Sequence, residues 1–284
     1  MIKVLSSGFF NTIQDLGRFG YGELGVPVSG AMDMFSTNLA NSILKNDAND
    51  AVLEITLGKT KLLIDEQTVI SITGADFSPK INGVNVPLNT ALIIQKGDIL
   101  TFHNARYGVR CYLAVKGGFQ TDIVLGSRSF YKDLTTQNNI KKNDKLPINL
   151  FSNNKKKTFS SVKINSIHFS SNTIEVYTGP EYDLLSDSQK DQFSDVLFTI
   201  SKENSRMGYR LNEHIENDLG SLLTSCVLPG TVQLTPSGKI IILMRDCQVT
   251  GGYPRILQLT ENAINKLAQK STGDTFKFKI VSLD

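Results

Sequence analysis

Short apolar or alternating runs, rich in Val, Ile, Leu, Thr and Phe, dominate the chain, and Gly, Asn, Asp or Pro interrupts them. Because successive side chains of a strand point to opposite faces, this pattern predicts β-strands. The predicted strands cover residues 51–56, 61–64, 68–72, 91–94, 98–102, 109–116, 173–177, 196–200, 231–234, 239–244 and 275–281.

Helical periodicity is confined to three segments. The first follows Asp33, a plausible N-cap, and carries Phe35, Leu39, Ile43 and Leu44 on one stripe. The second is predicted at 181–193, and the third at 261–270, capped by Thr260. Many strands with few helices favour barrels or sandwiches over alternating βαβ layers, so the sequence predicts a mainly β fold.

The length of 284 residues suits two medium domains. Residues 135–172 carry little apolar periodicity, which predicts a polar linker or excursion between an N-terminal β-domain (1–134) and a C-terminal β-domain (173–284). Two short motifs occur on both sides of it. "TGA" at 73–75 matches "TGP" at 178–180, and "RYGVR" at 106–110 matches "RMGYR" at 206–210, which suggests an internal duplication.

Charge and special residues exclude several classes of protein. The net charge is +3, and many of the excess lysines lie in the polar stretch, which is more typical of a solvated loop than of a nucleic-acid surface. No apolar run approaches the roughly 18 residues of a membrane span, and no signal peptide is evident. The cysteines and histidines are few and scattered, so we expect a cytoplasmic protein without a disulfide framework or bound metal.

The stretch "GYGELG" at 20–25 spells the dinucleotide pattern G-x-G-x-x-G without its context. No apolar strand precedes it, and Pro27 stands where the phosphate-binding helix should begin. These glycines are better interpreted as allowing positive φ in a loop that approaches something closely. "LGKT" at 57–60 lacks the first glycine of a phosphate loop, because Leu53 occupies that position, and is interpreted as a turn between strands.

Several polar groups could carry chemistry. The two R-x-G-x-R motifs can hold an anion or pair with acidic neighbours. Asp15, Glu23 and Asp33 cluster with Arg18 in the opening segment, where capping and a salt bridge are the alternatives to catalysis.

Ser29, Ser127 and Cys247 are conceivable nucleophiles, but no G-x-S-x-G elbow surrounds them. "MRDCQVTGGYPRI" follows an apolar strand with a double glycine, which could bind an oxyanion or form a hairpin.

Four longer segments closely resemble the carboxyltransferase subdomain A and B family. They are "TIQDLGRFGYGELGVPVSGAMD" at 12–33, "LAVKGGF" with "VLGSRS" within 113–129, "SRMGYRL" at 205–211 and "TGGYPRILQL" at 250–259. The family includes the C subunit of bacterial ATP-dependent 5-oxoprolinase, also called KipA or allophanate hydrolase subunit 2, and a module of urea carboxylase. The resemblance spans nearly the whole chain in the family's order.

The resemblance implies two cyclophilin-like β-barrel domains and two partners, a KipI-like B subunit and an A subunit, acting together with ATP on 5-oxoproline. Because this chain lacks a nucleotide signature, ATP is expected elsewhere in the complex, and no cofactor is expected on this chain alone. The alternatives are a biotin-dependent carboxyltransferase in a urea carboxylase-like complex, with biotin on another protein, and a KipA-like regulator that binds a KipI-like kinase inhibitor.

For an amidohydrolase component of this kind, we expect loops from the two barrels to hold a carboxylated substrate and a developing oxyanion. The candidates for proton transfer are Asp15 and Asp246. The candidates for substrate binding are Arg18, Ser29, Arg106, Arg110, Arg206, Arg210, Gly251, Gly252 and Tyr253.

Overall fold

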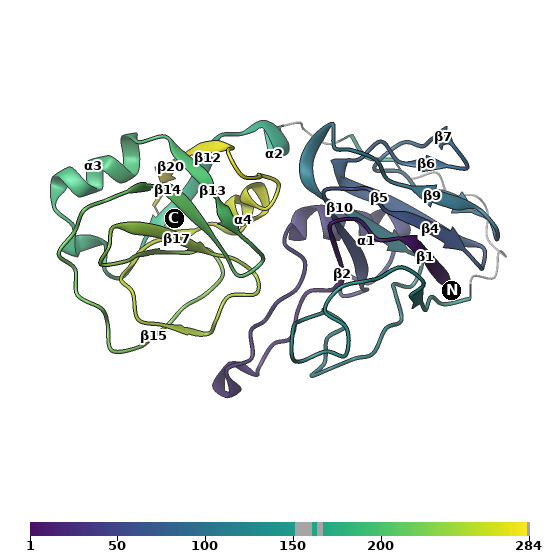
Figure 1. Ribbon diagram of the computed structural model, residues 1–284, viewed down its shortest axis with the longest axis horizontal. Coiled ribbons are helices and arrows are strands. Elements are labelled where there is room, and N and C mark those ends of the chain that lie inside the picture. The colour runs from purple at the N-terminus through teal and green to yellow at the C-terminus, as the bar shows by residue number, and fades with distance from the viewer. Residues whose placement is uncertain (151–160, 164–166, 283–284) are drawn as a thin grey trace. The chain divides into compact units, whose positions relative to one another are not determined.

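A computed structural model of the chain describes residues 1–150, 161–163 and 167–282. It divides into two compact units (Figure 1). Unit 1 comprises Met1–Arg18 and Ser29–Ser166, and unit 2 comprises Phe19–Val28 and Ile167–Asp284. Both units consist mainly of strands, so the prediction of a mainly β fold is confirmed. Among the described residues, no helix is both long and apolar enough to span a membrane.

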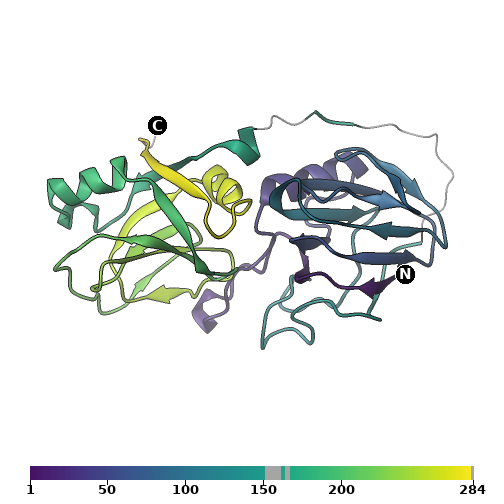
Figure 2. The ribbon, with the colours of Figure 1, turned by 45° about the horizontal axis from the view of Figure 1, so that its top comes forward.

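Unit 1 contains two antiparallel sheets (Figure 2). The six-stranded sheet has the order β11-β1-β4-β9-β6-β7, and the five-stranded sheet has the order β2-β3-β10-β5-β8. The strands are β1 (Ile2–Ser6), β2 (Phe10–Gln14), β3 (Val52–Thr56), β4 (Lys61–Ile64), β5 (Thr68–Asp76), β6 (Lys80–Ile81), β7 (Val84–Asn85), β8 (Leu92–Ile94), β9 (Ile99–Thr101), β10 (Tyr107–Val115) and β11 (Lys145–Leu146).

The main core of unit 1 draws buried side chains from both sheets. Ile2 and Leu62 come from the six-stranded sheet, and Ile55, Ile72 and Leu113 come from the five-stranded sheet. Removing this apolar surface from water is the main force that holds the two sheets together. Part of the stretch predicted as a linker belongs to this unit, because Lys145 and Leu146 pair with β1. Residues 151–160 and 164–166 of that stretch lie outside the described residues.

Unit 2 contains a closed barrel in the order β12-β19-β16-β17-β14-β13-β20, and β20 closes it by pairing in parallel with β12. A two-stranded sheet, β15-β18, accompanies the barrel. The strands are β12 (Thr173–Thr178), β13 (Phe198–Asn204), β14 (Gly208–His214), β15 (Ser225–Cys226), β16 (Thr231–Leu234), β17 (Lys239–Leu243), β18 (Thr250–Gly251), β19 (Arg255–Leu259) and β20 (Thr275–Ile280).

Helix α1 (Met34–Leu44) packs on β5 and β10. The predicted cap is confirmed, since the Asp33 carboxylate accepts a hydrogen bond from the Ser36 amide at 3.0 Å. The predicted apolar stripe is wrong at Phe35, which is 43% exposed. The buried face instead includes Ser36 and Thr37, and Thr73 of β5 donates a hydrogen bond to the Ser36 carbonyl at 2.7 Å.

The helices of unit 2 are short. The predicted helix at 181–193 is divided into a 3-10 turn, η2 (Tyr182–Leu184), and α3 (Asp187–Asp195), because Ser186 forms a capping box with Gln189 and starts a new helix. Helix α4 (Glu261–Leu267) begins at the predicted cap, Thr260, and α2 (Ile167–Ser170) precedes β12.

The "GYGELG" segment forms a 3-10 turn, η1 (Gly22–Leu24), with neither a strand before it nor a phosphate-binding helix after it. Gly20 and Gly25 adopt φ of 89° and 73°, as predicted. Within the described residues, a Cβ at either position would have no atom within 4 Å, so no close neighbour in this chain requires glycine there. Backbone conformation, not crowding, therefore favours glycine at these two positions.

Candidate functional site

A groove with a volume of about 540 Å³ lies on the barrel of unit 2. The end of β13 and the following turn form one side of it, through Glu203, Asn204 and Ser205. Gln248 and Tyr253, from the loop around β18, also line the groove. The groove therefore gathers residues that are distant in sequence.

Strand alternation determines which side chains reach this groove. Tyr209 and Leu211 of β14 are buried in the barrel, so Gly208 and Arg210 belong to the opposite face. Arg210 pairs directly opposite Ile241 in the register of β14 and β17. Gly208, Arg210 and Ile241 accordingly line the groove together.

The chemistry of the groove suits an anionic molecule that carries an amide. The Arg210 guanidinium is half-exposed and forms an ion pair with Glu203. Amide side chains from Asn204, Gln233 and Gln248 supply both donors and acceptors. An arginine fork with several amides can recognise a carboxylate and a neighbouring carbonyl or N–H group.

The first glycine of the pair, Gly251, belongs to the two-stranded sheet β15-β18. Gly251 of β18 pairs with Ser225 of β15. A Cβ at Gly251 would lie 2.6 Å from the Gln233 side-chain nitrogen, so the absence of a side chain allows Gln233 its position. The structure thus brings Arg210 and Tyr253 to one groove, and it places Gly251 against another residue of its lining.

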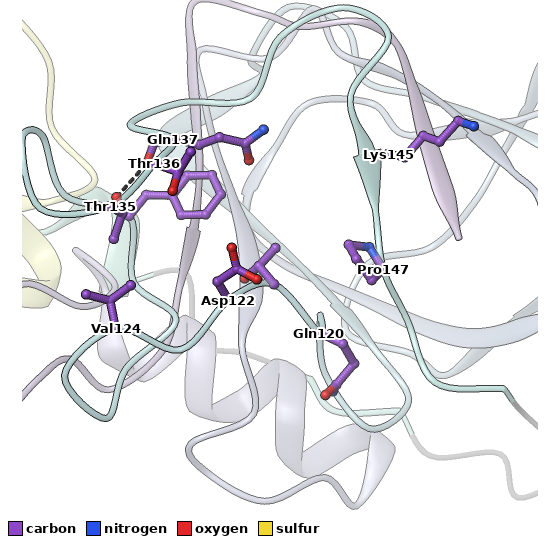
Figure 3. A pocket seen from close by; sticks show the side chains of 10 residues that line it. Gln120, Asp122, Val124, Thr135, Thr136, Gln137, Lys145 and Pro147 are labelled. Atoms are coloured by element: carbon purple, nitrogen blue, oxygen red, sulfur yellow. Dashed lines mark hydrogen bonds between the residues drawn. The ribbon is translucent and has the colours of Figure 1, made fainter.

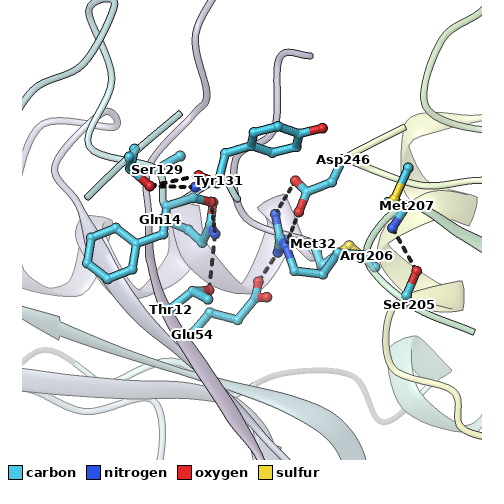
Figure 4. A network of polar contacts seen from close by, with 12 residues as sticks. Thr12, Gln14, Met32, Glu54, Ser129, Tyr131, Ser205, Arg206, Met207 and Asp246 are labelled. Atoms are coloured by element: carbon cyan, nitrogen blue, oxygen red, sulfur yellow. Dashed lines mark hydrogen bonds and ion pairs between the residues drawn. The ribbon is translucent and has the colours of Figure 1, made fainter. Parts of the chain in front are cut away.

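Arg206 and Asp246, both predicted site residues, bind each other in unit 2 (Figure 4). The guanidinium donates two hydrogen bonds to the carboxylate, from Nε at 2.7 Å and from Nη2 at 2.8 Å. Both residues are buried. The Asp246 amide also donates to the Arg206 carbonyl at 2.9 Å, so this pair ties the turn before β14 to the segment after β17.

Asp15 of unit 1 lies at the centre of a buried hydrogen-bond network, here called the clasp, with Gly17 and residues 127–129. Its carboxylate accepts hydrogen bonds from the Ser127 and Ser129 hydroxyls, each at 2.6 Å, from the Gly17 amide at 2.8 Å and from the Arg128 amide at 2.6 Å. Four donors match the capacity of an ionised carboxylate. These hydrogen bonds hold the Asp15 side chain in one position between the opening segment and residues 127–129.

Arg18 joins the same clasp, because its guanidinium donates a hydrogen bond to the Ser129 carbonyl. Gln14, one residue before Asp15, donates to the Thr12 hydroxyl at 3.0 Å (Figure 4). Ser29 is buried and adopts φ of 61°, an uncommon conformation for a residue with a side chain. The opening segment therefore brings Asp15 and Arg18 together around Ser129.

The first R-x-G-x-R motif places its two arginines in different environments. Arg106 is largely exposed, and its guanidinium lies 3.6 Å from the Asp76 carboxylate. Arg110 is buried, 3.8 Å from the Glu54 carboxylate. Glu54 also accepts hydrogen bonds from the Tyr112 hydroxyl at 2.9 Å and from a backbone amide. Burial raises the pKa of Tyr112 well above its ordinary value, with the Glu54 charge as the next cause.

The internal repeat involves different arginines from those that the motifs suggest. In unit 1, β5 pairs with β10, with Thr73 opposite Tyr112. In unit 2, β12 pairs with β19, with Thr178 opposite Leu257. The next residues, Gly74 and Gly179, pack against the carbonyls of Arg110 and Arg255, respectively, each two residues before the paired position.

Arg255, rather than Arg206 or Arg210, is therefore the structural counterpart of Arg110. Each of the two counterparts pairs with a glutamate of its own unit, Arg110 with Glu54 and Arg255 with Glu181. The "TGA" and "TGP" match is supported by strand pairing, whereas the match of arginine motifs is not. Sequence reasoning missed Glu54 and Glu181, because neither belongs to a short motif.

The conceivable nucleophiles differ in their surroundings. Burial raises the pKa of the Cys247 thiol to about 12, so the thiolate is scarce at neutral pH. Ser127 donates its hydroxyl hydrogen to Asp15 inside the clasp. Among the described residues, no group of three or more His, Cys, Asp or Glu side chains is arranged to hold a metal ion.

Each of the two units is a β-domain. The barrel of unit 2 carries a polar groove that contains an arginine. The family description "Carboxyltransferase domain, subdomain A and B" matches residues 24–280, and the chain belongs to this family.

Two curated relatives and one solved structure are similar to the chain. The C subunit of 5-oxoprolinase from Escherichia coli is 34% identical over 292 residues, covering 100% of this chain and 92% of the relative. The urea amidolyase of Lachancea kluyveri is 38% identical over 130 residues, covering 45% of this chain and 7% of the relative. The crystal structure of the K. lactis urea amidolyase matches with a TM-score of 0.86 and 27% identity, covering 99% of this chain and 19% of that one.

Proposed function

We propose that this chain is the C subunit of an ATP-dependent 5-oxoprolinase complex, which hydrolyses 5-oxoproline to L-glutamate together with an A subunit and a KipI-like B subunit. The observation that carries the proposal is the 34% identity to the C subunit of a 5-oxoprolinase, which extends over the whole chain. Similarity restricted to one of the two units would support only a shared fold. We also propose that the complex works in the cytoplasm and that this chain is inactive alone.

The groove on the barrel of unit 2 is the proposed substrate site. Its Arg210 guanidinium would bind the carboxylate of 5-oxoproline, and the Gln233 and Gln248 amides would bind the lactam. The aromatic ring of Tyr253 would pack against the lactam ring of the bound substrate. A substrate carboxylate must compete with Glu203 for Arg210, which makes this recognition selective for ligands that offer further hydrogen bonds.

Asp15 of the unit 1 clasp and Asp246 of the unit 2 ion pair have a supporting role in this proposal. Asp15 and Asp246 are both held by several hydrogen bonds, so we propose that they position loops rather than transfer protons. A lactam is a poor electrophile, and phosphorylation of its oxygen by ATP would activate it for ring opening. Because the chain contains no nucleotide-binding signature, we propose that ATP binds in a partner protein of the complex.

Reconstitution with the A and B subunits tests the proposal. Glutamate release from 5-oxoproline and ATP should require this chain, and Arg210→Ala should raise the KM for 5-oxoproline about tenfold or more. Arg106→Ala is a matched control, because it removes an exposed, ion-paired arginine from the other R-x-G-x-R motif. Full activity without this chain would contradict the proposed function, and unchanged kinetics of Arg210→Ala would contradict only the site.

Carboxyl transfer in a urea carboxylase-like complex is the second candidate. The similarity to urea amidolyases, in sequence over 45% of this chain and in structure over 99% of it, favours this candidate. It requires biotin on a separate carrier protein. Transfer of a carboxyl group to urea from a carrier that bears carboxybiotin, with release of free biotin on the carrier and no glutamate release from 5-oxoproline, would favour it over the first candidate.

A further inference from the structure

Gln233 is the most deeply buried polar side chain among the described residues that line the groove of unit 2. It is 1% exposed, whereas Arg210 and Gln248 of the same lining are exposed. Packing on nearly all sides holds the Gln233 amide in one orientation, so it presents the same atom to every ligand. An exposed amide such as that of Gln248 can turn either its oxygen or its nitrogen toward a ligand.

The surroundings of Gln233 turn its amide nitrogen toward the protein. Nε2 donates a hydrogen bond to the Tyr253 carbonyl at 3.5 Å, and because a carbonyl can only accept, the nitrogen end must face it. The Gly251 backbone packs beside the same nitrogen. Oε1 accepts no hydrogen bond from the described residues, and it is not sealed from solvent. The oxygen is therefore the end of the amide that a ligand can reach.

Asn204 gives the groove a second acceptor of the same kind. Its Nδ2 donates to the Ser201 carbonyl at 2.7 Å and to the Thr272 hydroxyl at 2.8 Å. Both amide hydrogens are thereby used, so the oxygen of Asn204 is what remains for a ligand. The amides that the fold holds in place can accordingly bind N–H groups. A ligand without an N–H group would leave the buried Gln233 oxygen unpaired, which is costly.

The strand register sets the spacing between Gln233 and Arg210. Ile241 of β17 pairs with Arg210 of β14 on one side and with Gln233 of β16 on the other. Paired residues lie on the same face of a sheet, and two strand spacings separate these two backbones by roughly 10 Å. A carboxylate and an N–H group on one carbon, each with a hydrogen bond of about 3 Å, fit between the two side chains above Ile241.

A smaller cavity in unit 1, of about 250 Å³, has no comparable arrangement (Figure 3). Asp122 and Lys145 in its lining are exposed, and Figure 3 shows the Lys145 ammonium directed away from Asp122. The Gln137 amide of this cavity is exposed as well. In contrast to Gln233, every polar side chain of its lining is at least partly exposed. This cavity therefore offers a control position for ligand binding in the groove.

We propose that Gln233 determines the specificity of the unit 2 groove for a lactam N–H group. Its Oε1 accepts the hydrogen bond of the ring N–H, while Arg210 binds the neighbouring carboxylate. The Tyr253 carbonyl and the absence of a side chain at Gly251 keep the Gln233 nitrogen turned away from the ligand. This assignment rests on the proposed function, and it narrows the substrate class to carboxylated rings with a free N–H group.

Saturation-transfer NMR on the full chain tests this specificity with three ring compounds. The probes are 5-oxoproline, its oxygen analogue, in which a ring oxygen replaces N–H, and its carbon analogue, in which a CH2 group replaces N–H. Both analogues should bind about tenfold or more weakly than 5-oxoproline, because neither can donate to the Gln233 oxygen. Equal binding of the three compounds, or no binding of 5-oxoproline, would overturn the proposal.

Two variants test whether Gln233 causes the discrimination. Gln233→Met removes the acceptor at similar volume, so the affinities for 5-oxoproline and the carbon analogue should converge to within about threefold. Gly251→Ala should reduce the ratio of affinities as well, because its Cβ would lie 2.6 Å from the end of the Gln233 side chain and displace it.

The matched controls are Gln137→Met, in the cavity of unit 1, and Gly220→Ala, which has open space around the Cβ. Both should keep the ratio of about tenfold. A merely structural role of Gln233 would weaken the binding of both compounds alike in Gln233→Met. An unchanged ratio in that variant would therefore overturn the proposal.

Glutamate release by the reconstituted complex separates this proposal from the proposed function. Release of glutamate, combined with equal binding of the three compounds, would overturn the role of Gln233 and leave the reaction standing. A preference of the chain for the N–H compound without any glutamate release would contradict the reaction and still support recognition of N–H by Gln233.

Discussion

Arg206 and Asp246 are joined by two parallel hydrogen bonds in a buried, bidentate ion pair. Removing one partner deprives the other buried charge of its bidentate ion pair, which is costlier than removing both. Arg206→Ala should therefore destabilise unit 2 by about 3 kcal/mol. Urea denaturation followed by intrinsic fluorescence measures this change.

The same motif supplies the control for this prediction. Arg210, four residues later, forms a half-exposed ion pair with Glu203, and such pairs contribute little to stability. Arg210→Ala should leave the urea midpoint nearly unchanged. If both variants unfold at the same urea concentration, the assignment of Arg206 to structure and Arg210 to ligand binding is wrong.

Asp15→Asn distinguishes a structural role of Asp15 from a catalytic one. The asparagine side chain has one acceptor oxygen, and its NH2 group would face donors that now point to the carboxylate, such as the Ser127 hydroxyl. We expect a loss of about 2 kcal/mol or more in stability, seen as a lower melting temperature. A stable variant whose complex has lost activity would instead indicate proton transfer by Asp15.

The Glu181–Arg255 pair predicts a pH-dependent stability. Hydrogen bonding from Arg255 lowers the pKa of Glu181 from its ordinary value of 4.5. Between the lowered pKa and 4.5 the unfolded chain binds more protons, so the contribution of Glu181 is fully present above pH 4.5 and is lost as the pH falls through the lowered pKa. The difference in unfolding free energy between wild type and Glu181→Gln should shrink over that range.

Denaturant titrations of both proteins at several pH values measure this difference. Glu175→Gln is a suitable control, because Glu175 lies 3.9 Å from a mostly exposed lysine. A difference between wild type and Glu181→Gln that does not change with pH would contradict the link between Glu181 and Arg255.

Neither glycine of the internal repeat should tolerate a side chain, and Gly74 also has a positive φ of 82°. A Cβ at Gly74 or Gly179 would collide with the carbonyl of Arg110 or Arg255. Both alanine variants should lose more stability than Gly83→Ala, which has a positive φ of 84° but open space around the Cβ. Thermal denaturation compares the three. A larger loss in Gly83→Ala would show that conformation, not the close strand approach, determines these positions.

Local patterns in the sequence are sufficient to predict the β class, many strand positions and the caps of α1 and α4. These features follow from local patterns, since alternation marks a half-buried strand and Asp33 or Thr260 satisfies amides within its own first turn. The turn at 57–60 between β3 and β4 was predictable for the same reason.

Strand β2 was not predictable, because its polar residues are buried. Asn11 donates a hydrogen bond to the Thr60 hydroxyl at 2.7 Å, and Gln14 bonds Thr12. Only tertiary partners compensate for the burial of a polar strand, and a pattern of hydrophobicity contains no information about them.

The site was decided by tertiary structure in the same way. Two arginines of one motif, Arg206 and Arg210, differ in role because strand alternation and the position of Asp246, distant in sequence, bury one and expose the other. The sequence determined which groups were present. Only the fold decided their neighbours, because electrostatic and hydrogen-bond energies depend on distances that pairing between remote strands sets.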